Sequence, residues 1–529
     1  MRPSLRWTSF YKPARKLFSS SITRSSSNLA NQRGIATKMA ERSYDDAIDL
    51  LNTLQTPYAV LEQRRQAGIR IDEQANQQIR QCLSRIGYTQ GNLDKLNIVH
   101  VAGTKGKGST CAFVDSILSQ YRKSHDFPKN VGLFISPHLI AVRERIRINS
   151  VPITRELFAK YFFEVWDALE NGAGESIAPM EKPVYFRYLT LMSYHIFLRE
   201  GVDAAVYEVG VGGEYDATNV IERPAVTGIS TLGIDHVFTL GSTIDKIAWH
   251  KAGIMKNDSP ALTVPQVPEA MDVLKQRAEE RNVQSLQVVK EDKRLQGIKI
   301  RPDAAFQKGN ASLAISLAET VITKVDPTFK LSPDALPKEF VDGLEQVVWR
   351  GRCETKVEGN IRWYIDGAHT TDSIKVAERW FGGESSARSA KGPRVLIFNQ
   401  QGEHEPMQLL KDLYDAITSQ GLVKFTHVIF CTNFGAIAKK DHVNLTHNSK
   451  AIANLTTQKA FAESWTALDP SATVKVMTSI EEAFDYVRTL DTNGIESSDG
   501  KEEEVHTLIT GSLHLVGRAL GVLEGPDAL

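Results

Sequence analysis

Short apolar runs alternate along most of this chain with longer segments in which apolar residues recur at helical spacing. Short buried runs suit strands, and spacings of three and four residues suit helices that cover a sheet. Because the two alternate, the pattern predicts an α/β fold with a mainly parallel, doubly wound sheet and a second, smaller α/β unit. The expected strands are residues 98–101, 131–135, 142–148, 202–209, 225–229, 262–264, 361–365, 394–398, 426–431 and 507–510.

Segments with helical spacing lie between these runs. One of them, Tyr185–Arg199, is rich in aromatic residues, and we expect it to be a buried helix. Its His195 is then a core histidine rather than a ligand. The other expected helices are residues 44–54, 61–86, 111–121, 154–169, 244–255 and 307–320.

A glycine-rich turn connects strand 98–101 to the helix that follows it, and its text over Gly103–Thr110 is GTKGKGST. Strand, glycine-rich turn and helix together present backbone N–H groups and a helix N-terminus to a phosphate. Lys107 is placed to reach terminal phosphates, and a hydroxyl such as that of Ser109 can bind Mg²⁺. The turn therefore predicts a nucleotide site.

The match to the general P-loop pattern is imperfect. Val101 stands at the position of its first glycine, and Gly108 separates Lys107 from Ser109. An ordinary glycine-rich turn is therefore the alternative interpretation.

Polar residues also mark the ends of other expected strands, at the edge where parallel sheets bind ligands. Ser136, Glu208 and His236 each lie at such a position. A hydroxyl or a carboxylate beside a phosphate site is a candidate Mg²⁺ ligand. An ordinary turn serine and a structural salt bridge of Glu208 are the alternatives.

Arginines alternate with apolar residues over 142–148, at Arg143, Arg145 and Arg147. Such a row can steer an anionic substrate, or it can be the solvated face of a strand. Taken alone, the pattern favours the solvated face.

Composition limits the alternatives. A chain of 529 residues is long enough for two domains with extensions, and its 42% apolar and 24% charged residues are typical of a globular protein. The 63 basic and 63 acidic side chains balance, which gives no argument for a nucleic-acid partner. The four cysteines have no paired metal spacing and indicate a reducing compartment.

Residues 1–40 differ from the rest because they contain arginine, lysine and many serines but no Asp or Glu. This composition is typical of a mitochondrial transit peptide, and a disordered basic tail is the alternative. Met39 lies where acidic residues begin, so a second start there would give a cytoplasmic form. We expect at most a peripheral association with the mitochondrial inner membrane.

Taken in order, several stretches together resemble the folylpolyglutamate synthase family of Mur-type amide ligases, in its eukaryotic form. Each motif is weak alone, but the ordered set is specific and spans nearly the whole chain after residue 40. The stretches are GTKGKGST (103–110), SPHL (136–139) with VRERIRIN, KPVYFRYLTL (182–191), EVGVGGEYDATN (208–219), GIDH (233–236), LGSTIDKIAWHKAGIMK (240–256), QKGNASLA (307–314), WRGRCE (349–354), DGAHT (366–370) and TGSLHLVG (510–517).

The resemblance implies a P-loop, Mur-ligase-like ATPase domain over residues 41–350 that also binds folate, and a Rossmann-like ligase domain over 351–529. It implies ATP-dependent addition of L-glutamate to tetrahydrofolyl-(poly)glutamate through an acyl phosphate, giving ADP and phosphate. It also implies two Mg²⁺ ions, a monovalent cation and a monomeric protein.

The resemblance further assigns roles to single residues. The implied catalytic residues are Lys107, Lys251, which is carbamylated in this superfamily, and His369. The implied Mg²⁺ ligands are Ser136, Glu208 and His236. Arg352 matches the family arginine better than Arg350 does. The implied ATP contacts are Gly103, Thr104, Lys105, Gly106, Lys107, Gly108, Ser109, Thr110, Asn310, Arg352 and Asp366.

Two other functions remain open on the sequence. A dihydrofolate synthase would add the first glutamate to dihydropteroate. A P-loop nucleotide-binding switch without ligase activity would use the glycine-rich turn but would need no second domain.

Overall fold

The computed structural model describes residues 42–68, 73–171, 180–302, 305–388, 392–400, 406–419, 424–433, 453–490 and 504–525, with positions 435, 440, 441, 443, 445 and 529. The expected transit peptide, 1–40, lies outside the described residues.

An eight-stranded sheet forms the first part of the described chain, in the order β4-β3-β2-β5-β1-β6-β7-β8. All neighbouring strands are parallel except β2 with β3 and β3 with β4. The doubly wound, mainly parallel sheet expected from the sequence is therefore confirmed. The strands are β1 (Val99–Ala102), β2 (Val131–Phe134), β3 (Ile146–Ile148), β4 (Val151–Pro152), β5 (Ala204–Glu208), β6 (Val226–Ile229), β7 (Pro260–Thr263) and β8 (Ser285–Val288).

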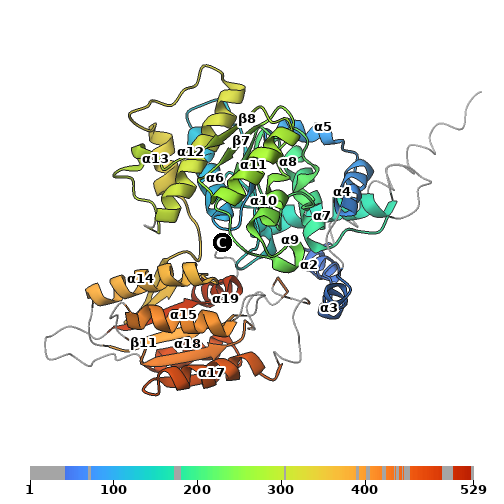
Figure 1. Cartoon of the computed structure of the whole chain (residues 1–529). Coiled ribbons are helices and arrows are strands. Elements are labelled where there is room, and N and C mark those ends of the chain that lie inside the picture. Colours follow the sequence, from blue (N-terminus) through green and yellow to red (C-terminus); the bar gives the residue numbers. More distant parts are fainter. Residues whose placement is uncertain are drawn as a thin grey trace, which may run out of the picture. The chain divides into compact units, whose positions relative to one another are not determined.

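Helices cover both faces of this sheet because successive strand residues point to opposite sides. Leu133 belongs to one buried cluster and Phe134 to the other, and Val206 and Tyr207 divide in the same way. The helices are α2 (Tyr44–Thr53), α3 (Tyr58–Gln66), α4 (Glu73–Arg85), α5 (Gln90–Leu93), α6 (Lys107–Tyr121), α7 (Arg155–Asn171), α8 (Tyr185–Arg199), α9 (Val237–Leu240), α10 (Ile244–Ala252), α11 (Pro268–Glu280), α12 (Ala305–Val325) and α13 (Lys338–Glu345) (Figure 1).

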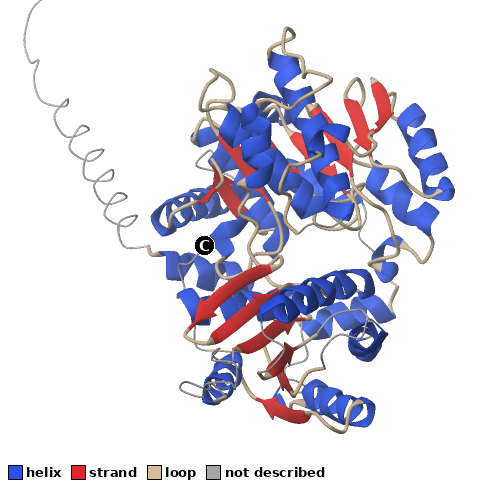
Figure 2. Cartoon of the chain, turned by 90° about the vertical axis from the view of Figure 1, so that its left-hand side faces the viewer, coloured by secondary structure: helices blue, strands red, loops and turns tan. Residues whose placement is uncertain are grey.

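A six-stranded sheet follows, in the order β13-β12-β11-β14-β10-β9, and only β9 runs antiparallel to its neighbour. Trp363 and Tyr364 point to its two faces, each into its own buried cluster. Helices again flank the strands (Figure 2). The elements are β9 (Glu354–Glu358), β10 (Ile361–Ile365), α14 (Thr371–Arg388), β11 (Arg394–Phe398), α15 (Pro406–Ser419), β12 (His427–Cys431), α17 (Thr456–Leu468), β13 (Thr473–Met477), α18 (Ile480–Thr489), β14 (Val505–Thr510) and α19 (Leu513–Glu524).

Two expected elements differ from the structure. The helix expected over 61–86 is two helices, α3 and α4, separated by residues outside the description. The strand expected over 142–148 begins as a 3₁₀ turn, Val142–Arg145, and only Ile146–Ile148 pairs with β2. The carboxylate of Glu144 explains the turn, because it accepts the N–H groups of three preceding residues at 2.6 to 3.1 Å.

The prediction that Tyr185–Arg199 is a buried helix is confirmed by α8. His195 is buried, its Nδ1 lies 2.9 Å from the Tyr88 hydroxyl, and its Nε2 lies 2.8 Å from a carboxylate oxygen of Glu164. Both ring nitrogens are thus used inside the protein, as expected for a core histidine.

Tyr44–Leu529 form one compact unit by their contacts, and the two sheets use strands on either side of residue 350. None of the helices in the described part of the chain combines the length and the apolar character that crossing a bilayer requires.

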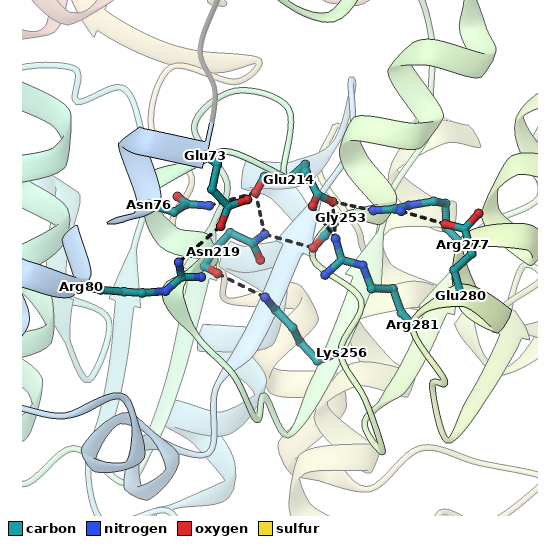
Figure 3. A network of polar contacts seen from close by, with 10 residues as sticks. All are labelled: Glu73, Asn76, Arg80, Glu214, Asn219, Gly253, Lys256, Arg277, Glu280 and Arg281. Atoms are coloured by element: carbon teal, nitrogen blue, oxygen red, sulfur yellow. Dashed lines mark hydrogen bonds and ion pairs between the residues drawn. The ribbon is translucent and has the colours of Figure 1, made fainter. Parts of the chain in front are cut away.

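A buried ion-pair cluster holds α10 and α11 against the loop after β5 (Figure 3). The Glu214 carboxylate accepts from Arg277 at 2.5 Å and also from Arg281. The side chains of Glu214 and Arg277 are only 14% and 8% exposed. Removal of one partner from such a buried ion pair is costly, because it leaves an uncompensated charge away from water.

The backbone of Glu214 is held as well. Its N–H donates to the His250 carbonyl at 2.7 Å, and its carbonyl accepts from the side-chain amides of Asn76 and Asn219. This cluster therefore sets the position of α10, the helix that carries Lys251, relative to the loop that follows Glu208.

We predict that Glu214→Gln lowers the free energy of unfolding by about 3 kcal/mol, because it removes the buried carboxylate that Arg277 and Arg281 share and leaves Arg277 with the more exposed Glu280, 2.8 Å away. Urea unfolding followed by circular dichroism measures this. The matched control is Glu73→Gln, whose partner Arg80 lies 3.5 Å away and whose own side chain is 70% exposed; we expect a change below about 0.5 kcal/mol. Equal losses in the two variants would contradict the assignment of this cluster.

Candidate active site

The glycine-rich turn lies between β1 and α6, as expected. Gly106 precedes the first residue of α6 with a φ of +85°, and Gly103 has a φ of +153°. A Cβ at Gly103 would lie 1.9 Å from Ser230 Oγ, and one at Gly106 would lie 2.1 Å from Asn310 Oδ1. Both positions therefore require glycine, and Asn310 packs directly on the turn.

Two lysine amines meet at one carbonyl of this turn. Lys107 Nζ and Lys251 Nζ each donate to the Gly103 carbonyl at 2.8 Å. Lys251 is 2% exposed, and its burial, together with the charge of Lys107, holds its pKa well below the usual range for lysine. Burial therefore disfavours the charged form of the Lys251 amine.

Ser136 and Glu208 are brought into contact. Glu208 ends β5, Ser136 follows β2 by two residues, and the Ser136 N–H donates to Glu208 Oε2 at 3.0 Å. Burial raises the pKa of the Glu208 carboxyl, while Lys107 and the Ser136 N–H act in the opposite direction. Within the described residues, no lysine or arginine forms an ion pair with Glu208.

His236 is placed differently from these two. It precedes the short helix α9 in a left-handed conformation, its side chain is 41% exposed, and its Nε2 lies 3.8 Å from an oxygen of Asp235. No group of three His, Cys, Asp or Glu side chains among the described residues is spaced to hold a metal ion. His236 lines the same cavity as Ser136 and Glu208.

The second sheet contributes Asp366, which follows β10 directly. Its oxygens accept the N–H groups of Cys353 and Ala368, each at 2.8 Å. Burial raises the pKa of the Asp366 carboxyl, and Arg352 lowers it. Arg352 also lowers the pKa of Glu208, so this guanidinium acts on carboxylates from both sheets.

Arg350 and Arg352 have different surroundings. Arg350 donates to Glu354 at 2.9 Å and to Glu524 at 2.5 Å, so its guanidinium is paired with carboxylates of the second part of the chain.

His369, in the loop after Asp366, has its Nδ1 2.8 Å from the Gly367 carbonyl.

A single cavity of 2070 Å³ joins these groups. Sites for drug-sized ligands are usually about 300–1,000 Å³, so this cavity has room for more than one substrate. Gly103, Thr110 and Lys251 lie behind its wall. The sequence-predicted residues that line it are Thr104, Lys105, Gly106, Lys107, Gly108, Ser109, Ser136, Glu208, His236, Asn310, Arg352, Asp366 and His369.

Sequence reasoning misjudged the arginine row. The solvated-face interpretation is wrong for Arg145 and Arg147, which are 9% and 8% exposed and line the cavity. The solvated face was inferred from the charge of the side chains alone. The local sequence does not reveal that this end of the strand faces a cavity. Trp349 was also missed as a wall residue, and a Cβ at Gly108 would lie 2.9 Å from its ring.

Comparison with solved structures identifies the fold. A Mycobacterium tuberculosis folylpolyglutamate synthase complexed with ADP matches with a TM-score of 0.64 at 23% identity, over 88% of this chain and 97% of that chain. E. coli FolC in complex with DHPP and ADP matches with a TM-score of 0.60 at 20% identity, over 90% of this chain and 99% of that chain. The fold is therefore shared with these two proteins, with a mainly parallel first sheet and a second sheet flanked by helices.

Sequence comparison is more specific. Folylpolyglutamate synthase of Neurospora crassa is 59% identical over 496 residues, which covers 92% of this chain and 93% of that protein. Folylpolyglutamate synthase of Saccharomyces cerevisiae is 42% identical over 504 residues, which covers 93% and 88%. A family model described as the C-terminal domain of dihydrofolate synthetase matches residues 350–522. The chain belongs to the folylpolyglutamate synthase family.

We predict that Gly106→Ala lowers the free energy of unfolding by at least about 1–2 kcal/mol, because a left-handed alanine is strained and its Cβ overlaps Asn310. Gly309→Ala is the matched control, since Gly309 lies inside α12 with nothing within 4 Å of its Cβ position. We expect that variant to gain about 0.5–1 kcal/mol. Thermal and urea unfolding decide, and a Gly106→Ala protein as stable as the parent would refute the packing described for the turn.

Proposed function

We propose that this protein is an ATP-dependent ligase that adds L-glutamate to the γ-carboxylate of a tetrahydrofolyl-(poly)glutamate and releases ADP and phosphate. One observation carries the proposal. A single cavity is lined by the glycine-rich turn with Lys107, by Glu208 from the first sheet, and by Arg352 and Asp366 from the linker and second sheet. Such a site holds a nucleotide between two parts of the chain, and family membership supports the substrates.

The proposed reaction requires activation of the acceptor's γ-carboxylate. A carboxylate does not react with an amine at neutral pH because its leaving group is poor. Transfer of the γ-phosphoryl group to the γ-carboxylate forms an acyl phosphate and ADP, and the glutamate amine then attacks the acyl carbon, loses a proton and expels phosphate. Lys107 and Arg352 stabilise the negative charge that moves during transfer.

Water must be kept from the acyl phosphate, which it would hydrolyse. A cavity formed by two domains, 41–350 and 351–529, can close around the substrates about the linker near Trp349.

We propose Asn310 as a contact of the nucleotide base and His369 as a contact of the γ-phosphate or the incoming glutamate, because both line this cavity.

We propose that Mg²⁺ binds at Ser136, Glu208 and His236. The donor set fits a hard cation, because the buried carboxylate of Glu208, which forms no ion pair with a described lysine or arginine, lies beside Ser136, and the His236 imidazole lines the same cavity. Bound there, Mg²⁺ would neutralise phosphate charge. We expect two Mg²⁺ ions and a monovalent cation in the complete complex, although the protein residues described account for one site.

We also propose that Lys251 is carbamylated. Its amine is buried and close to Lys107, an environment that favours the neutral form that reacts with CO₂. In that reaction the amine nitrogen bonds to the carbon of CO₂ and releases a proton, so a cation becomes a carboxylate-like anion. This anion would offset the charge of Lys107 beside the Gly103 carbonyl.

Dihydrofolate synthase is the second candidate function. The family model that matches residues 350–522 carries that name, and the E. coli relative was solved with DHPP. A nucleotide-binding switch is less well supported, because it would not need Arg352 and Asp366 in the cavity.

We propose that residues 1–40 direct the protein to mitochondria and that a form starting at Met39 is cytoplasmic. The acid-free, arginine- and serine-rich composition supports this proposal. Fluorescent fusions of the full chain and of the chain from Met39 would separate the two forms. We expect a monomer, which light scattering of the purified protein measures.

Incubation of the purified protein with ATP, Mg²⁺, radiolabelled L-glutamate and either a folate monoglutamate or dihydropteroate tests the function. We expect label in folate polyglutamates and glutamate-dependent release of ADP. Labelling of dihydropteroate alone would establish the second candidate. ADP release without dependence on glutamate would instead identify a nucleotide switch.

We predict that Lys107→Ala and Glu208→Gln each reduce glutamate addition by at least about 100-fold, since each removes a charge that holds the triphosphate or its metal. Circular dichroism and thermal unfolding should remain close to those of the parent. Lys123→Ala is the control, because this exposed lysine lies just beyond α6. Normal turnover by either site variant would refute the assignment.

We predict that Lys251→Ala is inactive and regains part of its activity with short carboxylates such as formate or acetate, which replace the carbamate. The intact mass of the parent under CO₂, and ¹³C NMR after ¹³CO₂ labelling, report the modification directly. Absence of both the labelled carbon and any rescue would count against carbamylation.

A further inference from the structure

Two buried guanidiniums face the cavity from one edge of the first sheet. Arg145 immediately precedes β3 and Arg147 lies within it, and their exposures are 9% and 8%. Both line the cavity, and burial lowers the pKa of both groups. Buried arginines are normally paired with an anion, because an unpaired charge away from water is costly.

Among the described residues neither Arg145 nor Arg147 forms an ion pair within 4.0 Å, although Glu144 lies near enough to raise the pKa of both, as Glu208 does for Arg145 and Asp115 for Arg147. Each of these carboxylates accepts a hydrogen bond from a group other than the two guanidiniums. Glu144 accepts three backbone N–H groups, Asp115 accepts the Ser150 hydroxyl at 2.6 Å, and Glu208 accepts the Ser136 N–H.

One edge of each guanidinium is fixed. Arg145 Nε donates to His138 Nδ1 at 3.0 Å, and His138 Nε2 lies 3.0 Å from the carbonyl of Asp441. The ring therefore accepts from the arginine on one side and donates to the carbonyl on the other. Arg147 Nε donates to the Glu144 carbonyl at 3.2 Å. Both side chains are thus held in place while their terminal nitrogens have no acceptor among the described residues.

The position in the sheet separates these arginines from the phosphate turn. β3 lies beyond β2 and β5 from β1, which is three strand spacings, or roughly 14 Å. The triphosphate already has Lys107 and the N-terminus of α6. A different anion is therefore expected near Arg145 and Arg147, and Arg145 lies close enough to Glu208 to affect its pKa.

We propose that Arg145 and Arg147 form a carboxylate subsite that binds a glutamyl carboxylate which does not itself react. This inference rests on the proposed function. Two substrates carry such a group: the terminal glutamate of the acceptor has an α-carboxylate beside its reacting γ-carboxylate, and the incoming glutamate has two carboxylates beside its reacting amine. Dihydropteroate has a single carboxylate, which reacts, so an acceptor-side subsite would favour folate polyglutamates over it.

Steady-state kinetics of Arg145→Gln and Arg147→Gln test the subsite with ATP, a folate monoglutamate and L-glutamate varied separately. We expect the KM of the acceptor or of L-glutamate to rise about 10- to 100-fold, the effect of losing charge-assisted hydrogen bonds to a carboxylate. The KM of ATP should change less than about twofold. Lysine at either position keeps the charge but not the planar fork, so we expect intermediate values.

Substrate analogues identify which carboxylate is bound. The first arm uses an acceptor whose α-carboxylate is an amide, and the second uses glutamate with one carboxylate as an amide. An analogue that lacks the bound group should lose affinity for the parent protein but lose little more with Arg145→Gln, because the interaction is already absent. Such non-additivity in either arm supports the subsite and names its ligand.

Arg143→Gln is the matched control, since Arg143 belongs to the same row but donates to the Ile153 carbonyl and does not line the cavity. We expect its three KM values to stay within about twofold of the parent. A rise confined to the KM of ATP, unchanged KM values, or full additivity in both arms would overturn the proposal. Glutamate-dependent ADP release by the parent, measured first, keeps this outcome separate from failure of the proposed function. Where a glutamine variant unfolds, the lysine variant provides the measurement.

Discussion

The carboxyl ends of parallel strands determine where the polar groups of this protein meet. β1 leads into the glycine-rich turn, β2 leads to Ser136, β5 ends at Glu208, and β10 leads to Asp366. The carboxyl ends of β1, β2 and β5 lie at one edge of the first sheet, and β10 brings Asp366 from the second sheet to the same cavity, so residues far apart in the sequence meet there. Each is then fixed by backbone hydrogen bonds, as the N–H groups of Cys353 and Ala368 fix Asp366.

The cavity collects charges that the fold alone does not balance. Glu208, Arg145 and Arg147 are buried and line the cavity, and none forms an ion pair within the described residues. Buried charges without a partner lower the free energy of unfolding unless a bound ligand supplies the opposite charge. The arrangement is understandable if nucleotide, metal and substrate carboxylates supply the missing partners, and if the ion pairs around Glu214 and the extensive apolar clusters on both faces of each sheet offset the loss.

The sequence was most informative where a residue's surroundings are determined locally. Strands such as β1, β5 and β11 are buried on both faces, so their continuous apolar runs could be recognised. The edge strands β8, β9 and β13 were not predicted, because their half-exposed residues resemble those of polar loops.

For the site, motif and strand-end arguments selected residues that the fold brings to one cavity, including Glu208 and Asp366. They could not reveal that Lys107 and Lys251 meet at the same carbonyl, or that Arg145 and Arg147 are buried. Those facts depend on helix α10 and strand β3 being placed by long-range packing, which no local pattern encodes.

The central claim is that one nucleotide is bound by both parts of the chain at the same time. A crystal structure with a non-hydrolysable ATP analogue, Mg²⁺ and a folate acceptor measures this most directly. The account predicts the triphosphate along the backbone of Gly103–Thr110, with its terminal phosphate in hydrogen-bond distance of Lys107 and with Arg352 and Asp366 in contact with the same nucleotide. A nucleotide bound away from that turn, or one that contacts no residue beyond Trp349, would contradict it.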